Sequence, residues 1–278
     1  MNWQADPVKS RLETLQLAFD PPDSSLRVVI LAAHPDDETI GASALLARFP
    51  FAHVIFLTDG APRDAKLWPP DMRGSREDYA NTRREEAERA LAYAGLCGEQ
   101  ISWLGGMDQD AVLEIRSLAA RLRESLRDYR PQVLITHPYE GGHPDHDSAA
   151  LIARLAIAGL ATVAPDLCEM TSYHARNGQC VTGEFLNSNS SAEILFDLTE
   201  ADRERKRKMM DEYKSQRLVL ENFPIGGEKL RIAPECDFSQ PPHEGKLWYE
   251  CMGWTMTGAR WRDLASAGCS QAQECSCG

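Results

Sequence analysis

Short apolar runs alternate along the chain with longer stretches in which apolar residues recur at helical spacing. The runs are continuous, which is typical of parallel strands covered on both faces. The expected strands cover residues 28–31, 52–57, 101–104 and 133–136, and the expected helices cover residues 39–48, 75–94, 111–129 and 148–160. This order predicts an α/β fold with a Rossmann-like, mostly parallel sheet flanked by helices.

The pattern becomes mixed after residue 160. Residues 167–173, 192–198 and 247–252 are strand-like, whereas residues 199–220 read as a charged helix capped by Thr199. We therefore expect a smaller, mixed part of the molecule to follow the regular alternation of strands and helices.

These patterns divide the chain into an α/β core over residues 1–160, a mixed lobe continuous with it over residues 161–268, and a flexible tail over residues 269–278. Within the core, the apolar spacing of residues 2–19 predicts a helix that covers the sheet. The tail, CSQAQECSCG, has cysteines close enough to bind a metal, but a disordered end is the favoured interpretation.

Composition and charge exclude several classes of protein. A chain of 278 residues with 43% hydrophobic content can bury a sizeable core. Its 30 basic and 42 acidic residues give a net charge of −12, which argues against a nucleic-acid partner. The sequence shows no stretch of about 18 apolar residues and no signal-peptide pattern, so we expect a cytoplasmic protein without a membrane span. Its composition is also compatible with a homo-oligomer. The eight cysteines are accordingly expected to be reduced thiols.

The first apolar run ends abruptly in one histidine and three acids, His34, Asp36, Asp37 and Glu38. In open α/β sheets, ligands bind in the crevice beyond the carboxyl ends of the strands. His34 and Asp37 can close on one ion from such a turn, and Asp36 stays free between them. Two ligands and one spare carboxylate suggest a hydrolytic metal site.

A second polar cluster follows the fourth apolar run. His143 and His146 lie three residues apart at the entry to the next expected helix, so they can face the same side. Parallel strands joined by right-handed crossovers would bring both strand ends into one cleft. Acids at a helix N-terminus are also favoured by the helix dipole alone. Two clusters at two strand ends nevertheless favour a metal site.

Two motifs carry a resemblance to a known family. Residues 33–38 read AHPDDE and residues 142–146 read GHPDH. In this order they resemble the zinc-dependent N-deacetylases that include the LmbE-like and PIG-L-type enzymes, which act on substrates containing N-acetylglucosamine. The agreement covers about residues 27–160 and is loose beyond them.

The resemblance implies a role for each residue of the two motifs. It implies that His34, Asp37 and His146 bind zinc and that Asp36 is the general base, while His143 stabilises the oxyanion or protonates the leaving amine. This assignment is chemically sound, because zinc with three protein ligands keeps a position for water that a free carboxylate can deprotonate. Iron(II) suits the same ligands.

Two further residues near the second motif have expected roles. Asp145 can orient His143 by accepting the other imidazole N–H, as supporting carboxylates often do. The chain has Gly141 and Gly142 where some family members place a mobile tyrosine that polarises the carbonyl, and whether Tyr139 replaces that tyrosine is left open by the sequence.

The remaining candidates concern the substrate, which we expect to be a small N-acetylated sugar or its conjugate. Arg63 lies in a long loop expected over the site, and Arg83 lies where the family has a similar residue. Tyr173 and His174 are candidates for a substrate wall, with a core role for either equally compatible with the sequence. Hydrogen-bond donors of this kind suit sugar hydroxyls.

Three alternative functions differ in what they require of the sequence. A nucleotide-binding dehydrogenase would need a glycine-rich phosphate loop where this chain has HPDDE, and acids there would repel a pyrophosphate. A non-enzymatic module that binds metal or carbohydrate would not need Asp36 beside His143. A metal-dependent amidohydrolase that cleaves another small amide, such as a thiol conjugate, is the main alternative.

Overall fold

The computed structural model describes residues 14–16, 19, 22–23, 25–161, 163–187 and 193–274. The expected helix over residues 2–19 therefore lies largely outside the described residues. Two of its apolar positions, Leu15 and Phe19, are described, and both are buried in the core.

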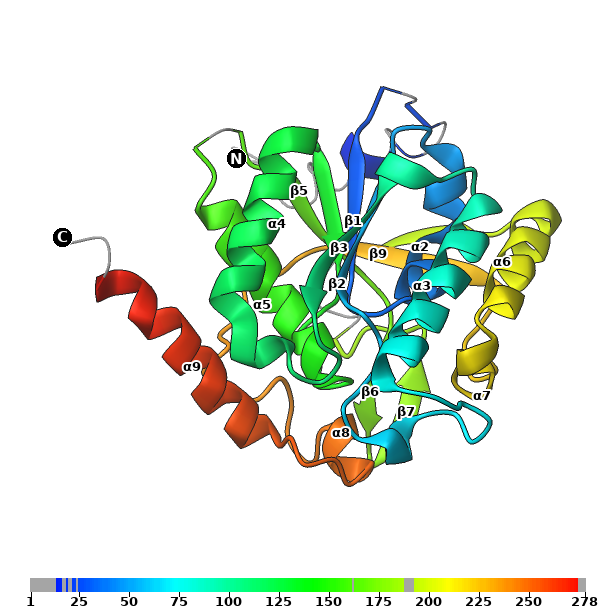
Figure 1. The fold of residues 1–278 in the computed structure, drawn as a ribbon. Coiled ribbons are helices and arrows are strands. Elements are labelled where there is room, and N and C mark those ends of the chain that lie inside the picture. The colour runs from blue at the N-terminus through cyan, green and yellow to red at the C-terminus, as the bar shows by residue number, and fades with distance from the viewer. Residues whose placement is uncertain are drawn as a thin grey trace.

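A seven-stranded sheet with the order β3-β2-β1-β4-β5-β9-β8 runs through the centre of the described structure (Figure 1). Its strands are β1 (Val28–Ala32), β2 (His53–Thr58), β3 (Ile101–Gly106), β4 (Val133–Thr136), β5 (Asp166–Met170), β8 (Glu193–Asp197) and β9 (Gly227–Ile232). The pairs among β3, β2, β1, β4 and β5 are parallel, and β9 and β8 continue the sheet with antiparallel pairing. The predicted mostly parallel α/β sheet is confirmed.

Helices cover both faces of this sheet (Figure 1). They are α2 (Asp37–Arg48), α3 (Arg76–Ala92), α4 (Ile115–Tyr129), α5 (Pro144–Ala158), α6 (Glu200–Glu212), α7 (Arg217–Leu220), α8 (Trp248–Cys251) and α9 (Gly258–Glu274), with short 3₁₀ helices η1 (Ala65–Leu67), η2 (Gly98–Gln100), η3 (Ala111–Glu114) and η4 (Lys214–Gln216). Helices α2, α3 and α6 pack on one face, and α4, α5 and α9 pack on the other. A small hairpin of β6 (Tyr173–Arg176) and β7 (Gln179–Thr182) lies apart from the sheet.

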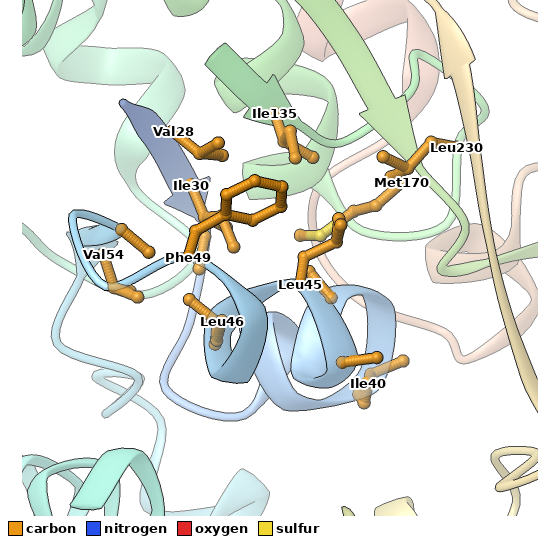
Figure 2. Packing of buried hydrophobic residues seen from close by; sticks show 14 of the residues in the cluster. Val28, Ile30, Ile40, Leu45, Leu46, Phe49, Val54, Ile135, Met170 and Leu230 are labelled. Carbon is orange, nitrogen blue, oxygen red and sulfur yellow. The ribbon is translucent and has the colours of Figure 1, made fainter. Parts of the chain in front are cut away.

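The two helical layers exist because every residue of β1 is buried. Successive strand side chains point to opposite faces, so Val28 and Ile30 enter the core under α2, whereas Val29 and Leu31 enter the core under α4 and α5. Figure 2 shows Val28 and Ile30 packed with apolar side chains of α2 such as Leu45. A continuous apolar run is therefore required at β1.

Polar caps set the start of two helices, and the cap at Thr199 confirms the prediction from the sequence. Ser75 precedes α3 and forms a capping box with Asp78, and Thr199 precedes α6 and forms one with Asp202. Each box satisfies two backbone N–H groups that the first helical turn leaves unpaired.

Two local predictions after residue 160 were wrong, and one strand was missed. Residues 247–252 form the short helix α8 and its flanks, because the Glu250 carboxylate accepts the Leu247 N–H at 2.9 Å and turns the chain. The run over residues 167–173 is split between β5 and β6. The strand β9 was not expected.

Residues 161–268 are joined closely to the core. Strands β5, β9 and β8 extend the central sheet itself, so the sheet crosses the boundary that the sequence placed at residue 160. Helix α9 continues to Glu274, so much of the expected flexible tail over residues 269–278 is helical and residues 275–278 lie outside the described part. Within the described residues no disulfide is formed, and none of the helices there is long and apolar enough to cross a membrane.

Candidate metal centre and active site

The turn between β1 and α2 brings the first motif to the carboxyl edge of the sheet. Asp36 precedes α2 with φ 125° and ψ −29°, a conformation that non-glycine residues rarely adopt. Hydrogen bonds fix this turn, because the Asp36 carbonyl accepts the N–H groups of Thr39 and Ile40, and the Asp36 N–H donates to Glu38. Strained backbone of this kind persists where the surroundings hold it, often at functional sites.

His34, Asp37 and His146 converge at one point between the first and second motifs. Asp37 Oδ2 lies 3.3 Å from His34 Nδ1, and Asp37 Oδ1 lies 3.3 Å from His146 Nε2. All three side chains are buried, and their ligand atoms lie within 4.8 Å of one another. Ligands about 2.0–2.1 Å from a tetrahedral ion are about 3.3 Å apart, so these spacings fit such an ion.

The donor set supports a metal ion independently of the spacing. His146 Nε2 is buried and has no hydrogen-bond partner within the described structure. The other ring nitrogen, Nδ1, lies 3.3 Å from Ser172 Oγ. A histidine whose one nitrogen is held by a neighbour and whose other nitrogen faces two more ligands has the arrangement of a metal ligand.

Asp145 supports His34, which differs from its expected role. Its Oδ2 lies 3.1 Å from His34 Nε2, and its carboxylate also accepts the backbone N–H groups of Gln109 and Ala111. It does not accept an N–H from His143, because His143 Nδ1 itself accepts the Asp145 backbone N–H at 3.0 Å and lies 3.9 Å from the carboxylate. His143 caps α5, so this nitrogen is occupied as an acceptor.

Asp36 lies beside the cluster and is held by Arg83. The Arg83 guanidinium donates to the Pro35 carbonyl at 2.6 Å and to Asp36 Oδ2 at 3.3 Å, and both side chains are buried. Burial raises the pKa of Asp36 to about 7, with Arg83 opposing the rise and the charge of Asp37 adding to it. The carboxylate is thus close to the ligands and fixed in direction.

His143 packs against two of the three clustered residues. Its ring centroid is 4.4 Å from that of His34 and 5.3 Å from that of His146. Burial, together with these neighbouring rings, lowers the pKa of His143 well below its ordinary value, so the ring is neutral. Since Nδ1 accepts a hydrogen bond, Nε2 carries the proton and can donate it.

The surroundings strongly shift the pKa values of the three candidate ligand residues. Burial disfavours the charged form of His34, but the carboxylates of Asp108, Asp145 and Asp37 raise its pKa well above the ordinary value. Burial works against the charge of Asp37 as well, yet the neighbouring histidines hold its pKa well below the usual range. Burial lowers the pKa of His146 to about 3. The result is a neutral histidine and a charged carboxylate, both suited to bind a cation.

The predicted substrate residues are distributed differently from the expectation. Tyr173 packs edge-on against His146 with centroids 5.1 Å apart, so the structure brings it to the cluster. His174 follows it on β6 and points to the opposite face, where its ring is fully buried 3.5 Å from Glu140. His174 therefore lies in the core, which is the alternative that the sequence left open, and not at the cluster.

The two arginines also differ from each other. Arg83 is buried beneath Asp36 and contacts it directly. The Arg63 side chain is 69% exposed and pairs with Asp110 at 2.6 Å. Arg63 is thus an exposed residue paired with Asp110, whereas Arg83 is buried against Asp36.

Tyr139 does not face the cluster. Its hydroxyl donates to the Gln240 carbonyl at 2.8 Å, and its ring packs near Phe238 and Trp261. This answers the question that the sequence left open, because the side chain is directed into another part of the core.

Three residues at the site were not predicted. Asp108 follows β3, and its Oδ1 lies 3.4 Å from His34 Nε2; the same rule of polar residues at strand ends could have found it. His137 follows β4, accepts the Ala33 N–H, and stacks on His146 with centroids 3.9 Å apart. For Ser172 the sequence offered no signal.

Comparison with known proteins supports the family drawn from the two motifs. The family model described as GlcNAc-PI de-N-acetylase (PIG-L) matches residues 29–157, which confirms the resemblance. A 1D-myo-inositol 2-acetamido-2-deoxy-alpha-D-glucopyranoside deacetylase from Thermobispora bispora is 32% identical over 146 residues, 44% of this chain and 48% of that protein. A mycothiol S-conjugate amidase from Streptomyces coelicolor is 28% identical over 158 residues, 49% of this chain and 53% of that protein.

The chain spans about half the length of these curated relatives. A solved structure of a deacetylase from teicoplanin biosynthesis, in complex with bog, has a TM-score of 0.55 with 14% sequence identity. The matched region covers 74% of this chain and 96% of the chain of the solved structure. At this identity, the likeness shows the shared fold alone.

Proposed function

We propose that this chain, whose residues 29–157 match the PIG-L family, is a zinc-dependent N-deacetylase that removes acetate from a 2-acetamido sugar or its conjugate. The observation that carries the proposal is the convergence of His34, Asp37 and His146 with an uncoordinated buried carboxylate, Asp36, beside them. Such a set suits metal-assisted hydrolysis of an amide, and the uncoordinated carboxylate is unnecessary for binding alone.

The three ligand residues offer two nitrogens and one carboxylate, a set that zinc accepts in catalytic sites and that iron(II) also suits. A divalent ion held there would polarise the amide carbonyl and lower the pKa of a water towards about 7. The neutral ring of His146 and the charged carboxylate of Asp37 are already in the protonation states that binding requires.

Asp36 is the general base in this proposal. It takes the proton of the attacking water at its carboxylate, and Arg83 keeps the carboxylate from turning away. The strained backbone at Asp36 separates its side chain from that of Asp37, which leaves one carboxylate for the ligand set and one for the proton. A positioned base of this kind contributes about 100-fold to 10,000-fold to a rate.

His143 is the donor on the other side of the substrate. Its Nε2–H can donate to the oxygen of the tetrahedral adduct or give its proton to the departing amine. The hydrogen bond from the Asp145 backbone fixes the tautomer and the direction of the ring. Asp36 and His143 thus supply the two proton transfers that amide cleavage needs, one accepting a proton and the other donating one.

Residues after the second motif supply the wall of the substrate site. The ring of Tyr173 lies against His146, and the half-buried ring of Trp254 lies edge-on to His143, with centroids 4.9 Å apart. Aromatic faces and a phenol hydroxyl suit the apolar and hydroxyl surfaces of a sugar ring. The names of the deacetylase relatives support an acetamido sugar as the group that enters here.

A second candidate function is cleavage of an amide in a thiol conjugate, which the mycothiol S-conjugate amidase relative favours. Both reactions attack an amide carbonyl at the same ligand set. They differ in the acyl group released, because a deacetylase releases acetate and an S-conjugate amidase releases a larger acid.

The test uses purified chain loaded with one equivalent of zinc and a panel of amides at equal concentration. N-acetylglucosamine and its conjugates are compared with simple N-acetyl amines, N-acetyl amino acids and amides of larger thiol-bearing acids, and both released acids and free amines are measured. We expect acetate from the sugars with the ring intact. Preference for an acyclic amide over every sugar would reject the sugar assignment and favour the amidase.

The metal is tested separately by elemental analysis of a His146→Ala variant. Loss of one of three ligands should remove most of the bound zinc and the activity with it. A His243→Ala variant, which removes a histidine outside the cluster, is the matched control and should keep both. Stoichiometric zinc in His146→Ala would contradict the ligand assignment.

A further inference from the structure

We infer that α6 positions the proposed metal site, and that Lys206 within this helix and Tyr213 directly after it are the residues through which it acts. Lys206 forms a buried ion pair with Glu228 of β9, and this pair bridges a break in α2. Tyr213 holds the turn before α2 through Glu38. The effect on zinc and on turnover rests on the proposed function, whereas the fixing of the turn does not.

Helix α2 is broken at Ala42. The φ of −150° and ψ of 21° at this residue are not helical, so residues 37–41 and 43–48 form two segments joined by a kink. Helix α2 contains no proline, so the kink requires another cause. A side chain that inserts into the hydrogen-bond ladder of a helix is one such cause.

Glu228 and Lys206 take the backbone groups on the two sides of the break. The Glu228 carboxylate accepts the N–H of Ser43 at 3.0 Å and the N–H of Ala44 at 3.1 Å. In an unbroken helix, these N–H groups would bond to carbonyls of the preceding turn. The Lys206 ammonium donates to the Ile40 carbonyl at 2.6 Å and to Glu228 at 3.0 Å. An anion thus lies at the start of the second segment and a cation at the end of the first, which the helix dipoles favour.

The burial of this pair indicates a role in geometry. Lys206 is 0% exposed and Glu228 is 2% exposed, although both residue types are almost never fully buried unless paired. Removing two charges from water costs free energy, so apolar residues can often replace a buried ion pair without loss of stability. Apolar residues cannot replace the three hydrogen bonds to backbone that keep the break open.

The break matters because the two segments have different surroundings. Leu45 and Leu46 of the second segment are buried in the core cluster that also contains residues of β1, so packing sets the direction of this segment (Figure 2). An unbroken helix would continue that direction as far as Asp37. The break separates the position of Asp37 from the packing of the helix that follows it.

The end of α6 holds the first segment at another point. Tyr213 is fully buried, and its hydroxyl donates to one carboxylate oxygen of Glu38. The other oxygen of Glu38 accepts the Asp36 N–H at 3.0 Å. Tyr213 therefore supports the strained backbone at Asp36, while Lys206 fixes the opposite end of the same segment.

The first test compares variants of the ion pair. Lys206→Met and Glu228→Met each leave one buried charge without its partner, so both should unfold at lower denaturant than wild type. In the Lys206→Met/Glu228→Met double variant, the freed backbone groups of α2 can bond to one another as in a continuous helix. Its unfolding midpoint should therefore exceed that of either single variant.

Zinc affinity separates positioning from stability in these proteins. Measured by competition with a chelator, it should be about 10-fold to 100-fold weaker in the double variant than in wild type. Tyr213→Phe removes one hydroxyl, should weaken zinc binding in the same direction, and keeps the test valid if the double variant folds poorly. Lys208→Met, which changes an exposed lysine of α6, is the control and should bind zinc as wild type does. Wild-type affinity in both the double variant and Tyr213→Phe would overturn the inference.

Turnover gives a measure that a loss of folded protein would not reproduce. At saturating zinc, kcat per folded enzyme should fall in the double variant while KM for the sugar stays unchanged, because the substrate wall is not altered. An unchanged kcat would contradict the positioning of Asp36.

Amide hydrogen exchange of the metal-free proteins does not depend on the proposed function. Residues 36–41 should exchange faster in the double variant than in wild type, whereas residues 116–128 of α4, on the other face of the sheet, should exchange at similar rates. Equal exchange over residues 36–41 would overturn the fixing of the turn by α6. If wild type binds no zinc, the proposed metal site fails, and hydrogen exchange still decides whether α6 holds this segment.

Discussion

The Oδ2 atom of Asp145 lies 3.1 Å from Nε2 of His34, although the two residues are 111 positions apart in the chain. Asp145 lies in the first turn of α5, which follows β4, and His34 lies in the turn that follows β1. The neighbouring, parallel pairing of β1 and β4 brings them together. This contact makes Asp145 the support of His34, a proposed metal ligand, and leaves the ring of His143 to be oriented by the Asp145 backbone N–H.

An Asp145→Asn variant tests this support. The amide lacks the charge that holds the His34 N–H, so affinity for zinc should fall by about 10-fold to 100-fold. Competition with a chelator measures the dissociation constant, and Asp128→Asn, an exposed acid on α4, is the control. Unchanged zinc affinity with a slower reaction would return Asp145 to the role of orienting His143.

An Asp36→Asn variant separates proton transfer from metal binding. The side chain keeps its size but cannot accept a proton, so turnover should fall by about 100-fold to 10,000-fold while bound zinc stays at one equivalent. Asp59→Asn is the control, because Asp59 also follows a strand but pairs with Arg76. A variant at Asp36 with near wild-type turnover would refute the base assignment.

Gly142 is required by a close approach of two backbone segments. A Cβ atom at this position would lie 2.0 Å from the backbone oxygen of Tyr173. Gly142→Ala should therefore destabilise the fold by about 2 kcal/mol or more and displace the loop before His143. Denaturant unfolding measures the loss, with Gly226→Ala as the control because a Cβ atom there would have no neighbour within 4 Å among the described residues.

His53 lies at the start of β2, at the edge of the sheet opposite the site. It should make the free energy of unfolding depend on pH. Burial lowers its pKa from 6.5 to about 4, and its Nε2 lies 2.8 Å from Ser102 Oγ. Because the unfolded chain takes up a proton below pH 6.5 that the folded chain does not, stability should be full above pH 6.5 and fall towards pH 4. The loss is about 2 kcal/mol after allowance for the part of the ring that water reaches.

The comparison is between wild type and His53→Gln, which keeps a polar side chain near Ser102 and cannot titrate. The free energy of unfolding is measured by denaturant between pH 7.5 and 4.5. The variant should show a shallower decline with acid than wild type. Parallel curves would mean that the pKa of His53 is the same in the folded and unfolded protein.

Much of the site could be predicted from the sequence because its signals are local. The run at Val28 to Ala32 ends in an acidic turn, and the run at Val133 to Thr136 ends before His143 and His146. Burial on both faces leaves a continuous apolar pattern, and helix caps such as Ser75 act within one turn. Such signals identify the elements and the chemistry at their ends.

The partners of individual side chains were decided only by the tertiary structure. Tyr173 and His174 are adjacent in sequence, yet only the direction of β6 determines that the first meets His146 and the second meets Glu140. Asp108 reaches His34 because β3 lies in the same parallel set of strands as β1. Neither contact leaves a trace in local spacing.

The sequence by itself therefore determined the alternating α/β core and the two motifs that hold the proposed ligands, because hydrophobic period and strand-end chemistry are properties of short segments. The tertiary structure decided the strand order, the extension of the sheet by β9 and β8, and the support of His34 by Asp145. The physical reason is that a hydrogen bond between distant segments depends on the register and direction of every element between them, which no local pattern records.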